Sequence, residues 1–178
     1  MWIWMLIIAG VVVIDQITKW LVVANMQLHE SIVVIPGVLN WTYTRNLGAA
    51  MGMLSTQRWV FMILSTVAIV LILWYLFKNH KESRFADLSL SLIVGGGIGN
   101  MIDRLFYKEG VIDFVDFCAF DFWTYIFNFA DVCVCVGGGM LMLWCILMLV
   151  KESKASKKKQ TESTDGEAVQ PKKEESDS

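Results

Sequence analysis

Histidine is scarce in this sequence, with only His29 and His80 among 178 residues. Neither lies near a cysteine, so the usual nitrogen and sulfur ligands of zinc do not cluster. Three of the four cysteines fall in one apolar run and are interpreted as buried, inert thiols, and Cys118 has no evident partner. We therefore expect no metal site and no cofactor.

Charge is also missing from most of the chain. Hydrophobic residues make up 56% of the sequence and the mean hydropathy is +0.53, which excludes an ordinary soluble domain. The net charge of -2 hides a segregation, because most charged residues lie between residues 78 and 84 or after Val150. This distribution predicts an integral membrane protein, and we expect no nucleic-acid partner.

Four apolar stretches are long enough to cross a bilayer, which takes about 20 helical residues. The first lacks the basic start and the small-residue cleavage site of a signal peptide, so we expect it to be retained. The sequence therefore predicts an all-α membrane protein whose single membrane domain spans residues 1–153. Its four transmembrane helices are expected over residues 3–24, 59–77, 85–107 and 125–150.

Lysine and arginine orient the predicted helices. Three basic residues lie between residues 78 and 84, and five lysines lie between residues 151 and 159. Because such residues favour the cytoplasmic side, we expect both termini inside and the loops 25–58 and 108–124 outside. The tail, residues 154–178, is charged and polar, and we expect it to be disordered in the cytoplasm.

The first outer loop has its own pattern. Residues 31–35 and 38–44 are rich in β-branched and aromatic residues, and the turn signal Pro36-Gly37 separates them. We expect a small antiparallel β-sheet here, between the first and second helices, lying at the outer membrane surface.

Two carboxylates lie inside apolar stretches. Asp103 and Asp131 each follow an asparagine by three residues, Asn100 and Asn128, so on a helix the polar groups share one face. A carboxylate in a membrane segment is costly and marks a functional site by default. At a rise of about 1.5 Å per residue, both aspartates fall near the outer boundary, and seven glycines on these two helices favour a close approach.

Two adjacent carboxylates that share one proton can act as an aspartic protease, since one deprotonates water while the other polarises a peptide carbonyl. The residues alone leave three other interpretations open. The acids could be neutralised by Arg104 and Lys19 and fix helix packing. They could form an ion relay with Asp15 in a small transporter, or belong to an inactive lipid-binding scaffold.

Five motifs occur in order along the chain, at suitable spacing. They are Asp15-Gln16-Ile17-Thr18-Lys19, Asn46-Leu47-Gly48-Ala49-Ala50, Gly96-Gly97-Ile98-Gly99-Asn100-Met101-Ile102-Asp103-Arg104, Val111-Ile112-Asp113-Phe114 and Phe127-Asn128-Phe129-Ala130-Asp131. With them, nearly all of residues 10–135 resembles the bacterial lipoprotein signal peptidase (signal peptidase II) family.

The resemblance implies an intramembrane aspartyl endopeptidase of the bacterial cytoplasmic (inner) membrane. Such enzymes remove signal peptides from prolipoproteins, cutting just before the cysteine that carries diacylglycerol, with the sheet as a cradle on the outer leaflet. By the matching motifs, Asp103 and Asp131 would be the catalytic pair, near the outer leaflet. The residues that would line the substrate site are Asn46, Asn100, Arg104 and Asn128.

Three more residues are expected to support the site. Asp15 and Lys19 lie four residues apart and can neutralise each other on one helix face, and Gly48 belongs to the motif that carries Asn46. Arg104 could instead reach lipid headgroups, and Asn46 could merely shape its loop. We expect a monomer whose partners are a diacylglyceryl-modified prolipoprotein and membrane lipid.

Overall fold

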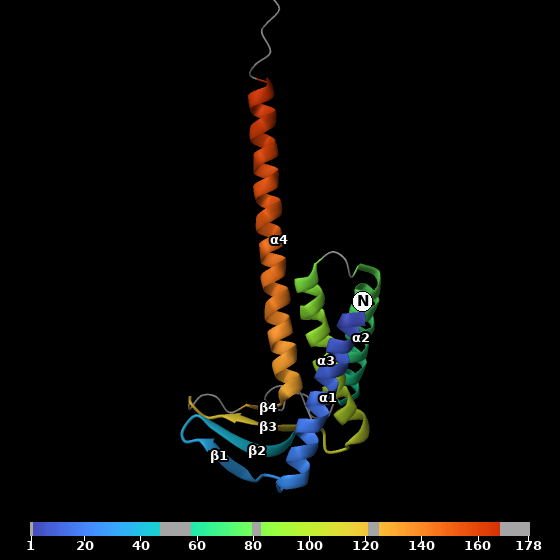
Figure 1. Ribbon diagram of the computed structural model, residues 1–178, viewed down its shortest axis with the longest axis vertical. Helices are drawn as coiled ribbons and strands as arrows, with labels where there is room; N and C mark the ends of the chain where they lie inside the picture. Colours follow the sequence, from blue (N-terminus) through green and yellow to red (C-terminus); the bar gives the residue numbers. More distant parts are fainter. Residues whose placement is uncertain (1, 47–57, 80–82, 121–124, 168–178) are drawn as a thin grey trace, which may run out of the picture. The chain divides into compact units, whose positions relative to one another are not determined.

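The computed structural model describes residues 2–46, 58–79, 83–120 and 125–167. The chain divides into two compact units, Met1–Leu141 and Met142–Ser178. The first unit contains three complete helices, the β-sheet and the start of the fourth helix (Figure 1). The second unit contributes the C-terminal part of that fourth helix.

The first three helices match the predicted stretches to within two residues. They are α1 (Trp2–Asn25), α2 (Arg58–Asn79) and α3 (Arg84–Phe106). Ser83 caps the start of α3, where its side-chain oxygen accepts a hydrogen bond from the backbone N–H of Ala86. This use of serine supplies an acceptor for one of the amide groups that a first helical turn leaves unpaired.

The fourth helix differs from its prediction at both ends. It was expected over residues 125–150, but α4 runs from Phe129 to Glu167. Its start moves because Ile126–Phe127 pairs with another strand instead of joining the helix. The prediction that disorder begins at residue 154 is wrong up to Glu167, where lysine, glutamate and alanine still favour helix. Residues 168–178 lie outside the described residues.

Three helices in the described part of the chain are long and apolar enough to cross a membrane: Trp2–Asn25, Arg84–Phe106 and Phe129–Ser156. Within α2, Met62–Lys78 forms a shorter apolar helix. The fold is thus a mostly helical membrane architecture with a small antiparallel sheet. A fourth crossing by α2 stays a prediction.

The sheet has four antiparallel strands in the order β1-β2-β3-β4 (Figure 1). The segment between α1 and α2 supplies β1 (Ser31–Ile35) and β2 (Leu39–Asn46), as expected. Gly37 in the turn between them has φ +73°, a conformation that glycine adopts without steric cost. The second loop adds β3 (Val111–Phe117) and β4 (Ile126–Phe127), which the sequence did not indicate.

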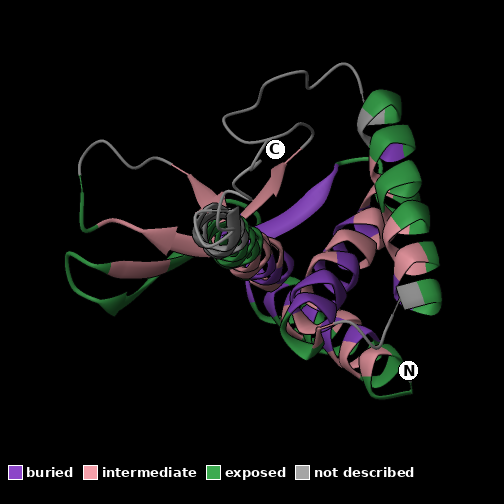
Figure 2. Cartoon of the chain, turned by 90° about the horizontal axis from the view of Figure 1, so that it is seen from above, coloured by how far each residue is buried: buried purple, intermediate pink, exposed green. Residues whose placement is uncertain are grey.

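Helix α3 packs against both α1 and α2. The buried residues of α1 follow a spacing of three or four, which places them on a single face, and two of them, Asp15 and Lys19, are charged. Figure 2 shows buried residues in purple on the packed helices. Glycines allow the close approach of α3 to its neighbours: a Cβ on Gly95 would lie 2.7 Å from Cβ of Val11, and a Cβ on Gly96 would collide with the carbonyl oxygen of Ala130. Small residues let membrane helices approach in this way.

Replacing Gly96 by alanine should therefore destabilise the protein. The new methyl group would meet backbone atoms of Ala130, which cannot rotate away as a flexible side chain would. Overpacking of this kind costs about 1–3 kcal/mol, so the melting temperature in detergent should fall. Gly10→Ala is the matched control, because nothing lies within 4 Å of a Cβ there. Equal melting temperatures for the two variants would contradict this packing.

Candidate active site

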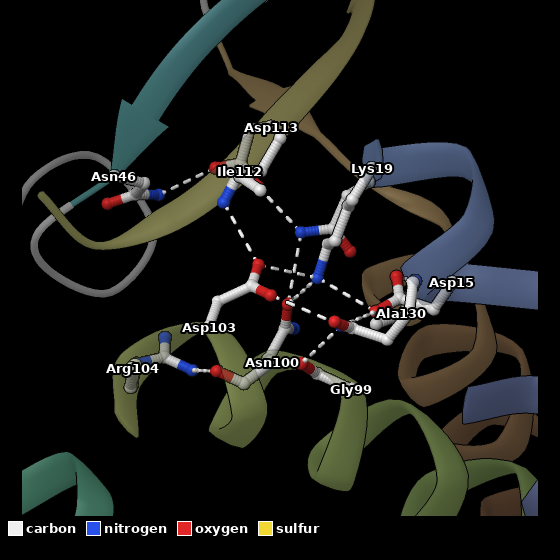
Figure 3. Close-up of polar contacts among 12 residues, drawn as sticks. Asp15, Lys19, Asn46, Gly99, Asn100, Asp103, Arg104, Ile112, Asp113 and Ala130 are labelled. Atoms are coloured by element: carbon white, nitrogen blue, oxygen red, sulfur yellow. Dashed lines mark hydrogen bonds and ion pairs between the residues drawn. The ribbon is translucent and has the colours of Figure 1, made fainter. Parts of the chain in front are cut away.

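Polar side chains from α1, α3, β3 and the start of α4 meet in one buried cluster (Figure 3). Each is at most 9% exposed, although the surrounding helices are apolar. Burial of this kind is unfavourable unless the groups satisfy one another through hydrogen bonds and ion pairs. The buried members are Asp15, Lys19, Asn100, Asp103, Asp113 and Asn128.

Lys19 lies at the centre of this cluster. Its ammonium nitrogen is 2.9 Å from a carboxylate oxygen of Asp15 and 2.9 Å from one of Asp103, and it donates a hydrogen bond of 3.0 Å to Oδ1 of Asn100. These three contacts match the three donors of an ammonium group. One cation therefore neutralises acids from two different helices and joins α1 to α3.

Asp103 has further partners inside the protein. Oδ1 accepts a hydrogen bond from the side-chain amide of Gln16, and Oδ2 accepts one from the backbone N–H of Ile112 in β3. The same amide of Gln16 also reaches Asp15 and the carbonyl oxygen of Gly99. Asp103 thus ties the end of α3 to β3, one residue before Asp113.

Lys19 also determines which way the amide of Asn100 points. Oδ1 of Asn100 accepts hydrogen bonds from Lys19 and from Nδ2 of Asn128. The amide nitrogen of Asn100 then faces Asp131 and donates a hydrogen bond of 2.8 Å to its Oδ1. The side-chain amide of Asn100 therefore links Lys19 on α1 to the carboxylate of Asp131 on α4.

Asn128 and Asp131 begin α4 as a reciprocal cap. Oδ1 of Asn128 accepts from the backbone N–H of Asp131 at 3.0 Å, and Oδ2 of Asp131 accepts from the backbone N–H of Asn128 at 3.2 Å. This arrangement satisfies two amide groups that a helix start leaves unpaired. A third backbone amide of this first turn, that of Ala130, donates a hydrogen bond of 3.0 Å to Oδ1 of Asp15 on α1. Asp131 thus lies in the first turn, where the helix dipole stabilises negative charge.

Asp113 on β3 has a different environment from Asp103. It is 1% exposed, and within the described part of the chain its two oxygens accept hydrogen bonds from neutral amides: Nδ2 of Asn128 at 2.6 Å and Nδ2 of Asn46 at 3.0 Å. Burial, together with the negative charge of Asp131, raises the pKa of Asp113 from 3.8 to about 7. Asp113 can therefore hold a proton at neutral pH.

The structure thus brings together most residues expected at the site. The expected pair, Asp103 and Asp131, is not the pair of acids that lies around one shared residue. Within the described residues, Asp103 and Asp131 share no hydrogen bond, and the chain of contacts between them runs through Lys19 and Asn100. Asp131 and Asp113 instead share Asn128, which binds both. Asp113 belongs to a motif of the sequence to which no role was assigned. A single acid in the β-branched and aromatic run Val-Ile-Asp-Phe-Val was the available signal.

Three other expected residues lie around this cluster. Asn46, at the end of β2, contacts Asp113. Arg104 donates to the carbonyl oxygen of Asn100 at 3.2 Å and, with Asp131, lines a cavity of about 230 Å³ between α2, α3 and the start of α4. Gly48 lies outside the described residues.

The arrangement can carry out acid–base chemistry. The carboxyl groups of Asp113 and Asp131 both bind Asn128: Asp113 accepts from its side-chain amide, and Asp131 accepts from its backbone N–H. Asp131 lies at a helix start, whereas Asp113 accepts from neutral amides. Two groups whose environments differ in this way can divide the roles of base and acid. Among the described residues, no group of three or more histidine, cysteine or acidic side chains could hold a metal ion.

Replacing Lys19 by methionine should destabilise the fold strongly. The change would leave two buried carboxylates without their shared cation, and breaking a buried ion pair costs about 3–5 kcal/mol. Thermal unfolding in detergent would measure the loss. Lys108→Met, which removes an exposed lysine, is the matched control. A similar, small effect of both changes would mean that the ion cluster contributes little to stability.

Comparison with known proteins gives consistent matches. Residues 7–147 match the family model described as signal peptidase (SPase) II. The chain is 44% identical over 149 residues to the lipoprotein signal peptidase of Halalkalibacterium halodurans, covering 84% of this chain and 93% of that protein. It is 43% identical over 137 residues to the lipoprotein signal peptidase of Symbiobacterium thermophilum, covering 77% and 90%.

Solved structures agree with these sequence matches. One, described as a bacterial membrane enzyme at 2.3 Å resolution, superposes with a TM-score of 0.75 at 33% identity, over 86% of this chain and 90% of that chain. A second, described in the same terms at 1.9 Å resolution, has a TM-score of 0.72 at 33% identity, over 82% and 93%. The chain belongs to the signal peptidase II family of membrane peptidases.

Proposed function

We propose that this protein is an aspartyl endopeptidase that removes signal peptides from diacylglyceryl-modified prolipoproteins, cutting before the lipidated cysteine. Its catalytic acids are Asp113 and Asp131. The observation that carries this proposal is the amide of Asn128, which bonds to Asp113 through Nδ2 and to the backbone of Asp131 through Oδ1. Membership of the family supports the substrate class.

The two acids have separate roles. Asp131, at the start of α4, takes a proton from water, and the oxygen of that water attacks the carbonyl carbon of the scissile peptide bond. Asp113 carries the shared proton at neutral pH and donates a hydrogen bond to the carbonyl oxygen, on which negative charge develops. Its pKa of about 7 suits this role, because Asp113 can still hold a proton near neutral pH. When the tetrahedral intermediate collapses, the C–N bond breaks and the leaving nitrogen receives the proton that Asp131 took from water.

Asp103, the acid first expected in the pair, becomes a positioning residue. Lys19 already neutralises it, and hydrogen bonds from Gln16 and Ile112 occupy its oxygens. A carboxylate with these partners is poorly placed to exchange a proton with water. Its contact with the backbone of Ile112 instead holds β3, and hence Asp113, at the end of α3.

The substrate would approach Asp131 through two cavities that its side chain borders. One contains Arg104 and the apolar surfaces of α2 and α3. The other, of about 270 Å³, is lined by Tyr125 and Phe127 and by Val132, Cys135 and Val136 on α4. Such surfaces suit an apolar signal segment and acyl chains. Asn46, Asn100, Arg104 and Asn128 would contact the substrate backbone around the scissile bond.

The proposed setting is the bacterial cytoplasmic (inner) membrane. Four helices would cross it with both termini in the cytoplasm, and the sheet would lie on the outer leaflet. A diacylated substrate is anchored in that leaflet, close to the ends of α1 and α3 where the acids gather. The protein would act as a monomer without a metal or other cofactor.

Conservative substitutions should separate the three aspartates. Asp113→Asn and Asp131→Asn should each abolish cleavage of a purified diacylglyceryl-modified prolipoprotein, because each removes one proton-transfer group while keeping the side-chain size. Asp103→Asn should keep measurable activity but lower the melting temperature, because Lys19 loses a partner. Gel-based cleavage assays and thermal melts on the same preparations would measure both effects.

The controls make the assignment decisive. Asp116→Asn changes an aspartate of the same strand whose carboxylate binds Thr42 instead, so it should cleave at the wild-type rate. Loss of cleavage in a stably folded Asp103→Asn together with retention in Asp113→Asn would return the catalytic role to Asp103. A wild type that fails on this substrate would reject the proposed function, as would loss of activity with a chelator and its recovery with zinc.

The proton on Asp113 should also appear in the pH dependence of stability. With a pKa raised from 3.8 to about 7, this group contributes stability that is complete below about pH 4 and lost as the pH rises through 7. The amide side chain of Asp113→Asn would not titrate, so the melting temperature of this variant relative to wild type should rise between about pH 4 and pH 7. Wild-type cleavage should decline above about pH 7. A melting difference independent of pH would contradict the proton on Asp113.

A further inference from the structure

An apolar groove lies between the outer part of α1 and the sheet, away from the acids. It has a volume of about 270 Å³. Its walls come from one face of α1 and from all three longer strands: Thr18, Leu21, Val22, Asn25, Met26, Ile32, Trp41 and Phe114.

The two polar side chains in this groove are already satisfied. The hydroxyl of Thr18 donates to the carbonyl oxygen of Asp15 at 2.8 Å, and the amide of Asn25 donates to that of Leu21 at 2.7 Å. The groove therefore offers hydrocarbon and aromatic surface. It extends over about 10 Å of helix, from Thr18 to Asn25.

The surface around the groove is also apolar. On α1, Ile14 and Ile17 are about half exposed, and every residue of β1 (Ser31–Ile35) is exposed. Large exposed apolar surfaces mark contact with a membrane or a partner. Since α1 is long and apolar enough to span a membrane, we expect its outward residues and the groove beside them to face lipid.

Arg45, a second feature of interest, lies on the same side of the sheet. Arg45 donates from Nε to the hydroxyl of Tyr43 at 2.8 Å, and its guanidinium lies 4.7 Å from the ring centre of Tyr107. No ion pair joins it to a carboxylate of the residues that the structure describes. Its Nη1 is buried without a hydrogen-bond acceptor. A buried donor without an acceptor is unfavourable. Arg45 as a whole is only partly buried, so the side chain keeps accessible surface for a ligand.

Tyr43 connects the groove to this cation. Its ring packs with Val22, Met26 and Phe114, which line the groove, while its hydroxyl contacts Arg45. Arg45 pairs across the sheet with Ile112, a member of the same core cluster, so both belong to the side that faces α1. Tyr43 therefore lies between the apolar groove and the guanidinium of Arg45.

We propose that this groove and Arg45 form a binding site for an anionic phospholipid of the bilayer. One acyl chain lies along α1 in the groove, and phosphate oxygens accept hydrogen bonds from the guanidinium of Arg45. Arginine matches phosphate well because its donors form a planar fork. The bound lipid would join the sheet to α1 through apolar contact at one end and charge at the other.

This site is separate from the proposed catalytic site. Successive side chains in a strand point to opposite faces, so Arg45 and Phe114 lie on one side while Asn46 and Asp113 lie on the other. A lipid-modified substrate cysteine would not explain the cation, because a diacylglyceryl thioether carries no phosphate. The proposal therefore stands whether or not the aspartate assignment is correct.

The test measures lipid binding to the full-length protein in detergent by native mass spectrometry. Phosphatidylglycerol should bind at least about tenfold more tightly than diacylglycerol, the size expected for one charge-assisted hydrogen bond to phosphate. Phosphatidylcholine carries the same phosphate beside a choline cation, so its affinity should lie between the two. Arg45→Gln should remove this preference, whereas Arg45→Lys should keep part of it. Leu21→Trp, which fills the groove, should weaken binding of all three lipids.

Matched variants control for nonspecific effects. Lys108→Gln removes an exposed lysine near the outer end of α3, and Ile17→Trp adds the same bulk to an exposed position of α1 outside the groove. Both should bind phosphatidylglycerol like the wild type. Inorganic phosphate that displaces the lipid fully would indicate a simple anion site. Equal binding of phosphatidylglycerol and diacylglycerol, unchanged in Arg45→Gln, would indicate a neutral acyl-chain site. Either result would overturn the proposal.

Discussion

The ammonium group of Lys19 is the contact on which the rest of the site depends. A lysine that is 1% exposed inside an apolar helix pair would be unfavourable alone, and so would the two aspartates beside it. Together, the three groups compensate one another and join α1 to α3. Because the third donor of the ammonium goes to Asn100, the same contact orients the amide that binds Asp131. The contacts of Lys19 therefore both hold α1 against α3 and fix the geometry of the site.

The start of α4 combines structural and chemical roles in the same residues. Asn128 and Asp131 cap the helix by bonding to each other's backbone amides. The cap leaves the amide nitrogen of Asn128 free to bond to Asp113 on β3. A helix start is therefore used to hold two acids close together at a position where the helix dipole favours negative charge. Moving Asp131 would uncap the helix, so the cap fixes the position of this acid.

The sheet contributes more than a surface at the ends of the helices. On one side, Asn46 and Asp113 join the cluster of acids and amides. On the other, Tyr43 and Phe114 pack on α1, and Arg45 extends the same face. The alternation of a β-strand thus separates the side that carries these acids and amides from an apolar side. This separation explains how a small membrane protein can carry two different environments a single residue apart.

The amino-acid sequence by itself determined the membrane class, the positions of α1, α2 and α3, the first hairpin and the family motifs, because these depend on local hydrophobicity, turn residues and short-range spacing. It also showed that buried carboxylates matter, but it could not show which acid has which partner. Two acids at Asn-x-x-Asp spacing look equivalent in the chain, although Lys19 binds Asp103 and a helix cap binds Asp131.

Only the tertiary structure decided the remaining points. The prediction extended the fourth helix back to Tyr125, but pairing with β3 makes Ile126–Phe127 a strand and leaves Asn128 to cap α4. The same pairing brings Asp113 to Asn128, and burial then gives that aspartate a pKa near neutrality. These features arise from contacts between segments distant in sequence, so local patterns carry no signal for them.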